Sequence, residues 1–150
     1  MYQSAGAYLQ SIRAKHIEIH NIKRELKAID HIYEVKGQAY SADKVSTTPR
    51  KDGLENTAIK HLERRMEAET RLHEKIADLT EQMEEAVRYI SMIESEDQQD
   101  VLMLRYIEFR SWSDIMEIRD CDDISGQYKL HRRALDSLQK ILDVHSMSTI

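Results

Sequence analysis

Residues that end or bend a helix are scarce in this sequence: its 150 residues include only four Gly and one Pro, and aromatic residues make up 6%. A chain with so few breakers has few places to turn, and no strand is expected. The single cysteine, Cys121, excludes an internal disulfide and offers no cluster of thiolates for a metal. A reducing compartment suits such a chain.

Long apolar runs are also missing. No stretch approaches the roughly 20 apolar residues of a membrane span, and the N-terminus lacks the basic-then-apolar layout of a secretory signal. We therefore expect a cytoplasmic protein without a membrane partner.

Basic residues are scarce in the last third of the chain. The formal net charge is −5, with 22 Lys and Arg against 27 Asp and Glu. Residues 1–93 hold 15 basic and 15 acidic residues, whereas residues 94–150 hold 7 and 12. Basic residues dominate only from 124 to 142, where there are four (Lys129, Arg132, Arg133 and Lys140) against the single acid Asp136.

What the chain does contain is helical periodicity. Residues 3–35 and 55–93 carry apolar residues at three- and four-residue steps, which predicts two long amphipathic helices. The first stripe consists of Leu9, Ile12, Ile19, Ile22, Leu26, Ile29 and Tyr33; the second consists of Leu72, Ile76, Leu79, Met83, Ala86, Ile90 and Ile93. Neither helix can bury its stripe alone, so residues 1–93 are expected to form an antiparallel coiled-coil hairpin.

Turn-forming residues gather between these helices, which predicts a mobile loop at 36–54. The second helix is the longer one, and its unpaired stripe favours a homodimer.

Three shorter helices are predicted for residues 94–145, followed by a tail at 146–150. Ser95 and Gln98 fit a capping box, and Ser111 with Asp114 fits the start of the next helix. Asp120 stands where the chain must reverse, because Asp tolerates the left-handed conformation. Asp122 or Asp123 is expected to cap the last helix. The fold class is therefore all-α: a long helical hairpin, then a three-helix helix-turn-helix domain.

Residues 101–142 resemble the helix-turn-helix of sigma factor region 4. The resemblance lies in LRYIE, then SWSDI, then KLHRRAL followed by a further Leu. It is strongest to phage-encoded late transcriptional regulators of the ArpU and RinA types, in which a helical N-terminal half precedes such a unit. It implies a transcription regulator in a bacterial host cell that binds duplex DNA, without catalysis and without a cofactor.

In that family the last helix enters the major groove and its first residues meet base edges. The resemblance therefore implies that the DNA-binding residues are Ser125, Gly126, Tyr128, Lys129, His131, Arg132 and Arg133. Arg and Lys can reach guanine or phosphate oxygens, and Ser can read either base class.

Two other features have plain and functional interpretations. His16 and His20 have a spacing that can hold zinc, but no third ligand is evident, so surface histidines are the expectation. Trp112 could stack on a base, but its place in the helix-turn-helix favours a core position. No nucleophile–base pair, carboxylate pair or phosphate-binding glycine loop is visible, so no enzyme is expected.

Two further functions stay open. The acidic helix-turn-helix could dock on RNA polymerase or another helical protein without binding DNA. Alternatively, the chain could be the recognition subunit of a phage DNA-packaging machine, which would form a ring of many subunits.

Overall fold

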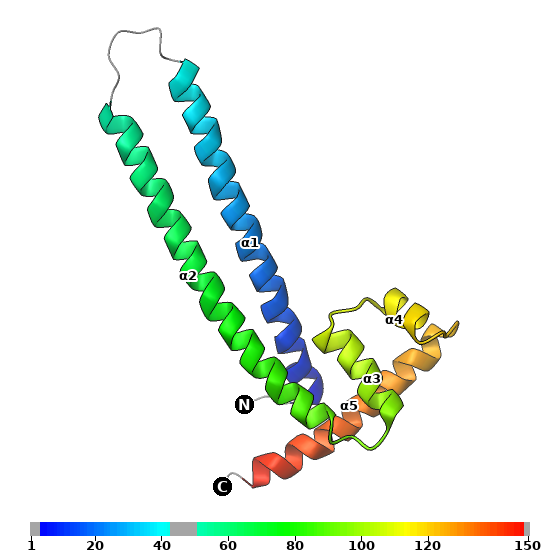
Figure 1. Cartoon of the computed structure of the whole chain (residues 1–150). Coiled ribbons are helices and arrows are strands. Elements are labelled where there is room, and N and C mark those ends of the chain that lie inside the picture. Colours follow the sequence, from blue (N-terminus) through cyan, green and yellow to red (C-terminus); the bar gives the residue numbers. More distant parts are fainter. Residues whose placement is uncertain (1–3, 43–50, 149–150) are drawn as a thin grey trace. The chain divides into compact units, whose positions relative to one another are not determined.

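The computed structural model describes residues 4–42 and 51–148, and the side chains of residues 4–39 and 55–148. Within these residues the chain is helical and contains no strand. The elements are α1 (Ala5–Ala42), α2 (Lys51–Ile90), α3 (Glu96–Leu102), the π-helical turn η2 (Met103–Ile107), α4 (Trp112–Ile118) and α5 (Ile124–Met147), as Figure 1 shows. The predicted all-α fold, a long helical hairpin followed by a helical C-terminal region, is confirmed.

The predicted bounds of the loop at 36–54 are wrong. Helix α1 continues to Ala42 and α2 begins at Lys51, and residues 43–50 lie outside the described part of the chain. Each residue added to an existing helix gains a hydrogen bond without a new nucleation cost. The roughly 1 kcal/mol that a glycine such as Gly37 costs a helix is too little to stop it.

The described chain divides into two compact units. The C-terminal unit comprises Met1–His16 and Asp78–Ile150, and the central unit comprises Ile17–Ala77. Each contains one part of α1 and one part of α2. No described helix is both long enough and apolar enough to cross a membrane.

In the central unit, α1 and α2 meet along a seam that is largely polar. Ile19 and Ile22 of α1 are buried there, and Ala68 of α2 is fully buried. Around these apolar residues, cross-helix ion pairs join Arg71 to Glu25 at 2.8 Å, Lys75 to Glu18 at 3.3 Å and Arg65 to Asp30. The ring of Tyr33 stacks on that of His61, with centroids 4.2 Å apart.

The seam predicted for α2 is therefore partly wrong. The residues that contact α1 or are fully buried beside it follow another register: His61, Arg65, Ala68 and Lys75. Ile76, assigned to the seam from its hydrophobicity, is 39% exposed. Charged residues occupy the seam because partners on α1 neutralise them, which an apolar pattern does not reveal.

The C-terminal unit has the larger core. Its most deeply buried side chains come from every helix of the unit, long and short: Leu9, Ile12, Ile90, Val101, Leu102, Tyr106, Ile115 and Leu138. The first turn of α1 is held against α5, because the backbone N–H of Ala5 donates to the side-chain oxygen of Gln139 at 2.6 Å. Gln82 of α2 donates to the hydroxyl of Ser11 at 2.5 Å. Helices α3 and α5 pack on each other in this unit.

The predicted first short helix changes its geometry before it ends. After α3 it widens into η2, and Phe109 then takes a positive φ of 57°. This conformation is uncommon for a bulky residue. It is held by a backbone hydrogen bond of 2.9 Å from Arg110 N–H to Leu104 C=O and by stacking of Phe109 on His16, with centroids 3.7 Å apart.

Candidate nucleic-acid interface

Helices α4 and α5 follow one another in the order of a helix-turn-helix, and their ends are capped as predicted. The Ser111 hydroxyl accepts a hydrogen bond from Asp114 N–H at 3.1 Å, and the Asp123 carboxylate accepts from Ser125 N–H at 3.0 Å. Asp120 takes the left-handed conformation, with φ 49°. The Ser95 hydroxyl caps α3 by accepting from Gln98 N–H at 3.4 Å. These caps fix where α4 and α5 begin.

Arg119 ties the turn to the rest of the C-terminal unit. Its side chain is only 14% exposed. One terminal nitrogen lies 3.0 Å from Asp97 and the other pairs with Asp100, both on α3. Its Nε donates to the side-chain oxygen of Gln127 at 3.2 Å, which explains how a glutamine is tolerated with only 7% exposure. The arginine therefore positions the first turns of α5.

The inner face of α5 carries an aromatic cluster. The Tyr106 hydroxyl and His131 Nε2 lie 2.8 Å apart, and the His131 ring meets Trp112 edge-on at 5.0 Å. Arg105 lies over the Trp112 ring at 5.1 Å, a cation–π arrangement. Trp112 is half-buried, so it closes the edge of the core.

Burial controls the titration of this cluster. Desolvation lowers the pKa of His131, and the neighbouring Arg105 cation lowers it further. Desolvation also raises the pKa of Tyr106 and lowers that of Arg105. Each shift favours the neutral form of a group that is costly to charge away from water. At neutral pH, His131 is an uncharged packing residue.

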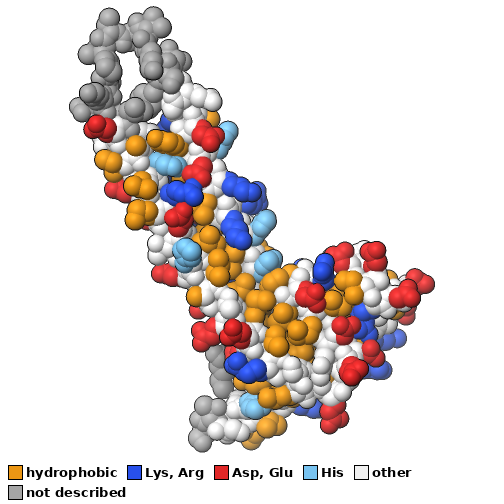
Figure 2. All heavy atoms as spheres, in the orientation of Figure 1, with side chains coloured by type: hydrophobic (Ala, Val, Ile, Leu, Met, Phe, Trp, Pro, Cys, Tyr) orange, Lys and Arg blue, Asp and Glu red, His pale blue; other side chains and the backbone are white. Residues whose placement is uncertain are grey.

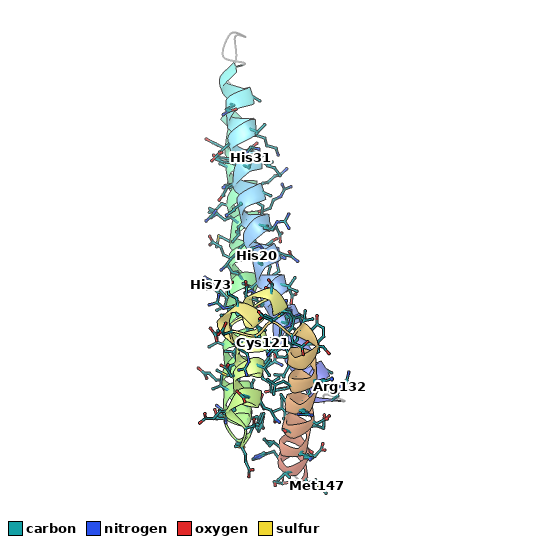
Figure 3. The ribbon with its side chains drawn as sticks, turned by 90° about the vertical axis from the view of Figure 1, so that its right-hand side faces the viewer. His20, His31, His73, Cys121, Arg132 and Met147 are labelled. Atoms are coloured by element: carbon teal, nitrogen blue, oxygen red, sulfur yellow. The ribbon has the colours of Figure 1, made fainter. Side chains whose placement is uncertain are left out.

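The outer face of α5 is exposed and mostly basic. Lys129, Arg132 and Arg133 are all exposed, and Figure 3 shows Arg132 projecting away from the helix axis. Among the described residues, no acidic side chain forms an ion pair with any of these three cations. Lys140 continues the same face, seven residues beyond Arg133. We call Lys129, Arg132, Arg133 and Lys140 the basic face.

Acidic residues surround the start of this helix. Asp120, Asp122 and Asp123 are all exposed just before α5. Figure 2 shows acidic side chains over the α4–α5 end of the C-terminal unit. The helix N-terminus, which would otherwise attract phosphate, is therefore occupied by carboxylates.

The predicted DNA-binding residues fall into two groups. Ser125, Tyr128, Lys129, Arg132 and Arg133 are exposed, and Gly126 is half-exposed. His131 turns inward to Tyr106 and Trp112. Tyr128 stands at the border, 45% exposed and edge-on to Trp112 at 5.0 Å.

The structural roles of two residues, Arg119 and His131, were not predicted from the sequence. The role of Arg119 was signalled by Asp97 and Asp100, which are spaced for one helix face, but a pairing across 19 residues has no local pattern. The inward orientation of His131 follows from its spacing of four from buried Gln127 and three from buried Ala134.

No metal site accompanies this interface. Within residues 4–42 and 51–148, no group of three or more His, Cys, Asp or Glu could hold a metal ion. His16 stacks on Phe109 instead, and His20 is exposed.

A second basic feature lies in the central unit. There α1 and α2 border a hollow of about 290 Å³, open to solvent and lined by Ile29, Ile32, Tyr33, Lys36, Asn56, Thr57, Lys60, His61 and Arg64. The cations in its lining, Lys36, Lys60 and Arg64, border the same hollow as the stacked rings of Tyr33 and His61.

Comparisons of the chain with protein-family models, with curated proteins and with solved structures find no match.

Proposed function

We propose that the chain is a DNA-binding transcriptional regulator that places the outer face of α5 against duplex DNA. The observation that carries this proposal is the basic face: Lys129, Arg132 and Arg133 project together into solvent, and none is paired with an acid among the described residues. Cations left free in this way can replace the counterions of phosphates, which supplies most of the affinity of non-specific DNA binding.

The positioning of α5 supports the same function. The Arg119 contacts and the Asp123 cap hold the first turns of α5 in one place, as a helix that reads base edges requires. Ser125 and Tyr128 at that end can then contact bases, while Arg132 and Arg133 contact phosphates. The resemblance of residues 101–142 to phage late regulators favours a phage origin and a role in transcription.

The acids at the start of α5 limit what one copy can do. Like charges there oppose the approach of phosphate, so a single interface binds weakly. Two interfaces joined in one dimer convert the second contact into an intramolecular step, which raises the affinity without any new contact. We therefore propose that the functional form is a homodimer.

The test is retention on duplex DNA at low salt. Arg132→Ala combined with Arg133→Ala should abolish retention while leaving the far-ultraviolet helical signal unchanged. The matched control, Arg24→Ala with Lys27→Ala, removes two exposed cations from the central unit and should retain DNA binding. For the unaltered chain, log affinity should fall linearly with log salt. Undiminished binding by the Arg132 and Arg133 variant would overturn the proposal.

A second function is favoured by a separate observation. Ile118, Ile124 and Tyr128 are 52%, 42% and 45% exposed close to the acidic turn. Exposed apolar residues with an acidic rim suit a helical protein partner, for which RNA polymerase is the candidate that the resemblance implies. Binding through this surface should depend weakly on salt, and Ile118→Lys should abolish it while sparing DNA binding.

A further inference from the structure

The hollow of the central unit lies where the seam between α1 and α2 is no longer closed. Elsewhere in that seam Ile19, Ile22 and Ala68 are buried. The residues around the hollow instead form one stripe on each helix: Ile29, Ile32, Tyr33 and Lys36 on α1, and Asn56, Thr57, Lys60, His61 and Arg64 on α2. Its volume of about 290 Å³ is close to the lower limit of small-molecule sites, about 300 Å³. A space of this size suits one small molecule.

The lining of the hollow is positively charged. Among the described residues it contains three cations, Lys36, Lys60 and Arg64, and no acid. All three cations are exposed, and none forms an ion pair with an acid in the described part of the chain. The cations of the seam differ, because Arg65 and Arg71 each pair with an acid of α1. Three like charges around one hollow repel one another and attract an anion.

His61 adds an unpaired polar atom to this lining. Its Nε2 lies 3.4 Å from the carboxylate of Asp30, which also pairs with Arg65. Its Nδ1 is buried and has no hydrogen-bond partner among the described residues. Buried polar atoms in folded proteins nearly always have such a partner. A polar group of a ligand beside His61 would provide it.

The α1 side of the hollow is apolar and aromatic. Ile29 is half-buried there, and Ile32 is 48% exposed. The ring of Tyr33 stacks on that of His61 with an angle of 19° between the ring planes. An apolar or planar group that covers this surface removes it from water, which is favourable. The hollow therefore suits a molecule that combines an anionic group with a planar apolar body.

We infer that the hollow binds a phosphate monoester of a small ring compound, of the class of the nucleoside monophosphates. A phosphate monoester carries a charge of about −1.5 to −2 at pH 7, so it neutralises more of the three cations than a carboxylate does. The Arg64 guanidinium can bind two phosphate oxygens at once, and Lys36 and Lys60 act as point charges. The ring then lies against Ile32 and Tyr33. This site belongs to the central unit and does not depend on the proposed DNA interface.

The first test is calorimetric titration of the full chain at low salt with the monophosphates of adenosine, guanosine, cytidine and thymidine, one at a time. At least one should bind with one site per chain. Inorganic phosphate and the matching nucleoside without phosphate should each bind at least about tenfold more weakly, because each lacks half of the contacts. Failure of all four monophosphates would overturn the inference, and so would equal affinity for inorganic phosphate. A single-stranded oligonucleotide that binds where the monophosphates do not would also overturn it.

The second test uses variants of exposed residues, so that the helical signal is retained. Lys60→Gln with Arg64→Gln should weaken binding of the monophosphate at least about tenfold, because two charged hydrogen-bond donors are lost. The matched control, Lys23→Gln with Arg24→Gln, removes one Lys and one Arg of α1 outside the lining and should bind normally. Ile32→Glu places a negative charge on the apolar side and should abolish binding. Undiminished affinity in the Lys60 and Arg64 variant would overturn the inference.

A third variant separates this site from DNA binding. Arg132→Ala with Arg133→Ala alters only the C-terminal unit, so it should leave the affinity for the monophosphate unchanged. Failure of DNA binding and failure of nucleotide binding are therefore distinguishable. Loss of nucleotide binding in this variant would contradict the placement of the site in the central unit.

Discussion

The Nε of Arg119 donates a hydrogen bond to the side-chain oxygen of Gln127 at 3.2 Å, across the turn that joins α4 to α5. Gln127 is only 7% exposed, so this oxygen has little access to water. Arg119→Ala should therefore lower the free energy of unfolding by about 1–3 kcal/mol, the usual cost of leaving a buried polar group unpaired. Urea denaturation measures this loss.

The pair of residues offers its own control. Arg119→Met with Gln127→Leu removes both polar partners, so it should be more stable than Arg119→Met alone. If the single and double variants unfold at the same urea concentration, the hydrogen bond contributes nothing.

His131 should make stability depend on pH. Its pKa in the folded chain is lowered, first by burial and then by Arg105. Below the ordinary histidine pKa, the unfolded chain thus binds more protons than the folded one, so stability is lost as pH falls from there toward the folded-state pKa. His131→Gln should flatten this slope between pH 8 and pH 5, measured by urea unfolding at each pH. An identical slope in both chains would contradict the assignment of His131 as a neutral packing residue.

Asp123 should weaken DNA binding while it stabilises α5. Asp123→Asn keeps an equally good helix cap and removes a negative charge at the proposed interface. At a separation of about 8 Å in water, one charge changes the binding energy by about 0.5 kcal/mol, so affinity should rise roughly twofold at low salt. Glu34→Gln is the control, because it removes one exposed negative charge from α1 in the central unit, outside the proposed interface. Equal gains in both variants would assign the effect to net charge alone.

The helices and their caps were predictable because their causes are local. Ser95, Ser111 and Asp123 cap through side chains within three residues of the N–H that they accept from. The turn at Asp120 has a similar local cause. Such features depend on neighbours in sequence, which a pattern of residue types contains.

The seam of α2 was not predictable in this way. The hydrophobic pattern predicts that Ile76 lies in the seam and that Lys75 does not. In the structure Lys75 contacts α1 and Ile76 is exposed. Lys75 lies in the seam because it pairs with Glu18, more than 50 residues away in the sequence, whereas Ile76 is 39% exposed. Helix α2 has apolar residues on two sides, such as exposed Ile59 and buried Ala68. The spacing of apolar residues in the sequence does not tell which side faces α1.

The candidate site was predictable in part. The basic residues of α5 could be found from composition, and four of them share the exposed face. The partner of His131, Tyr106, lies 25 residues upstream, and its contact depends on how α5 packs in the C-terminal unit. Whether a basic residue meets solvent or a ring is decided by tertiary structure.

The polar seam of the central unit also determines how its two helices align. If α2 slipped by one heptad in one direction, Arg65 would leave Asp30 and come level with Lys23. In the other direction, Arg65 would come level with Gly37 and Arg71 would leave Glu25 and come level with Ile32. Apolar residues alone would tolerate either slip, since Ile and Leu recur along both helices. The cross-helix ion pairs thus add little to stability in the observed alignment, but a shifted alignment loses several of them. Concentrated salt would weaken this preference for one alignment before it unfolded either helix.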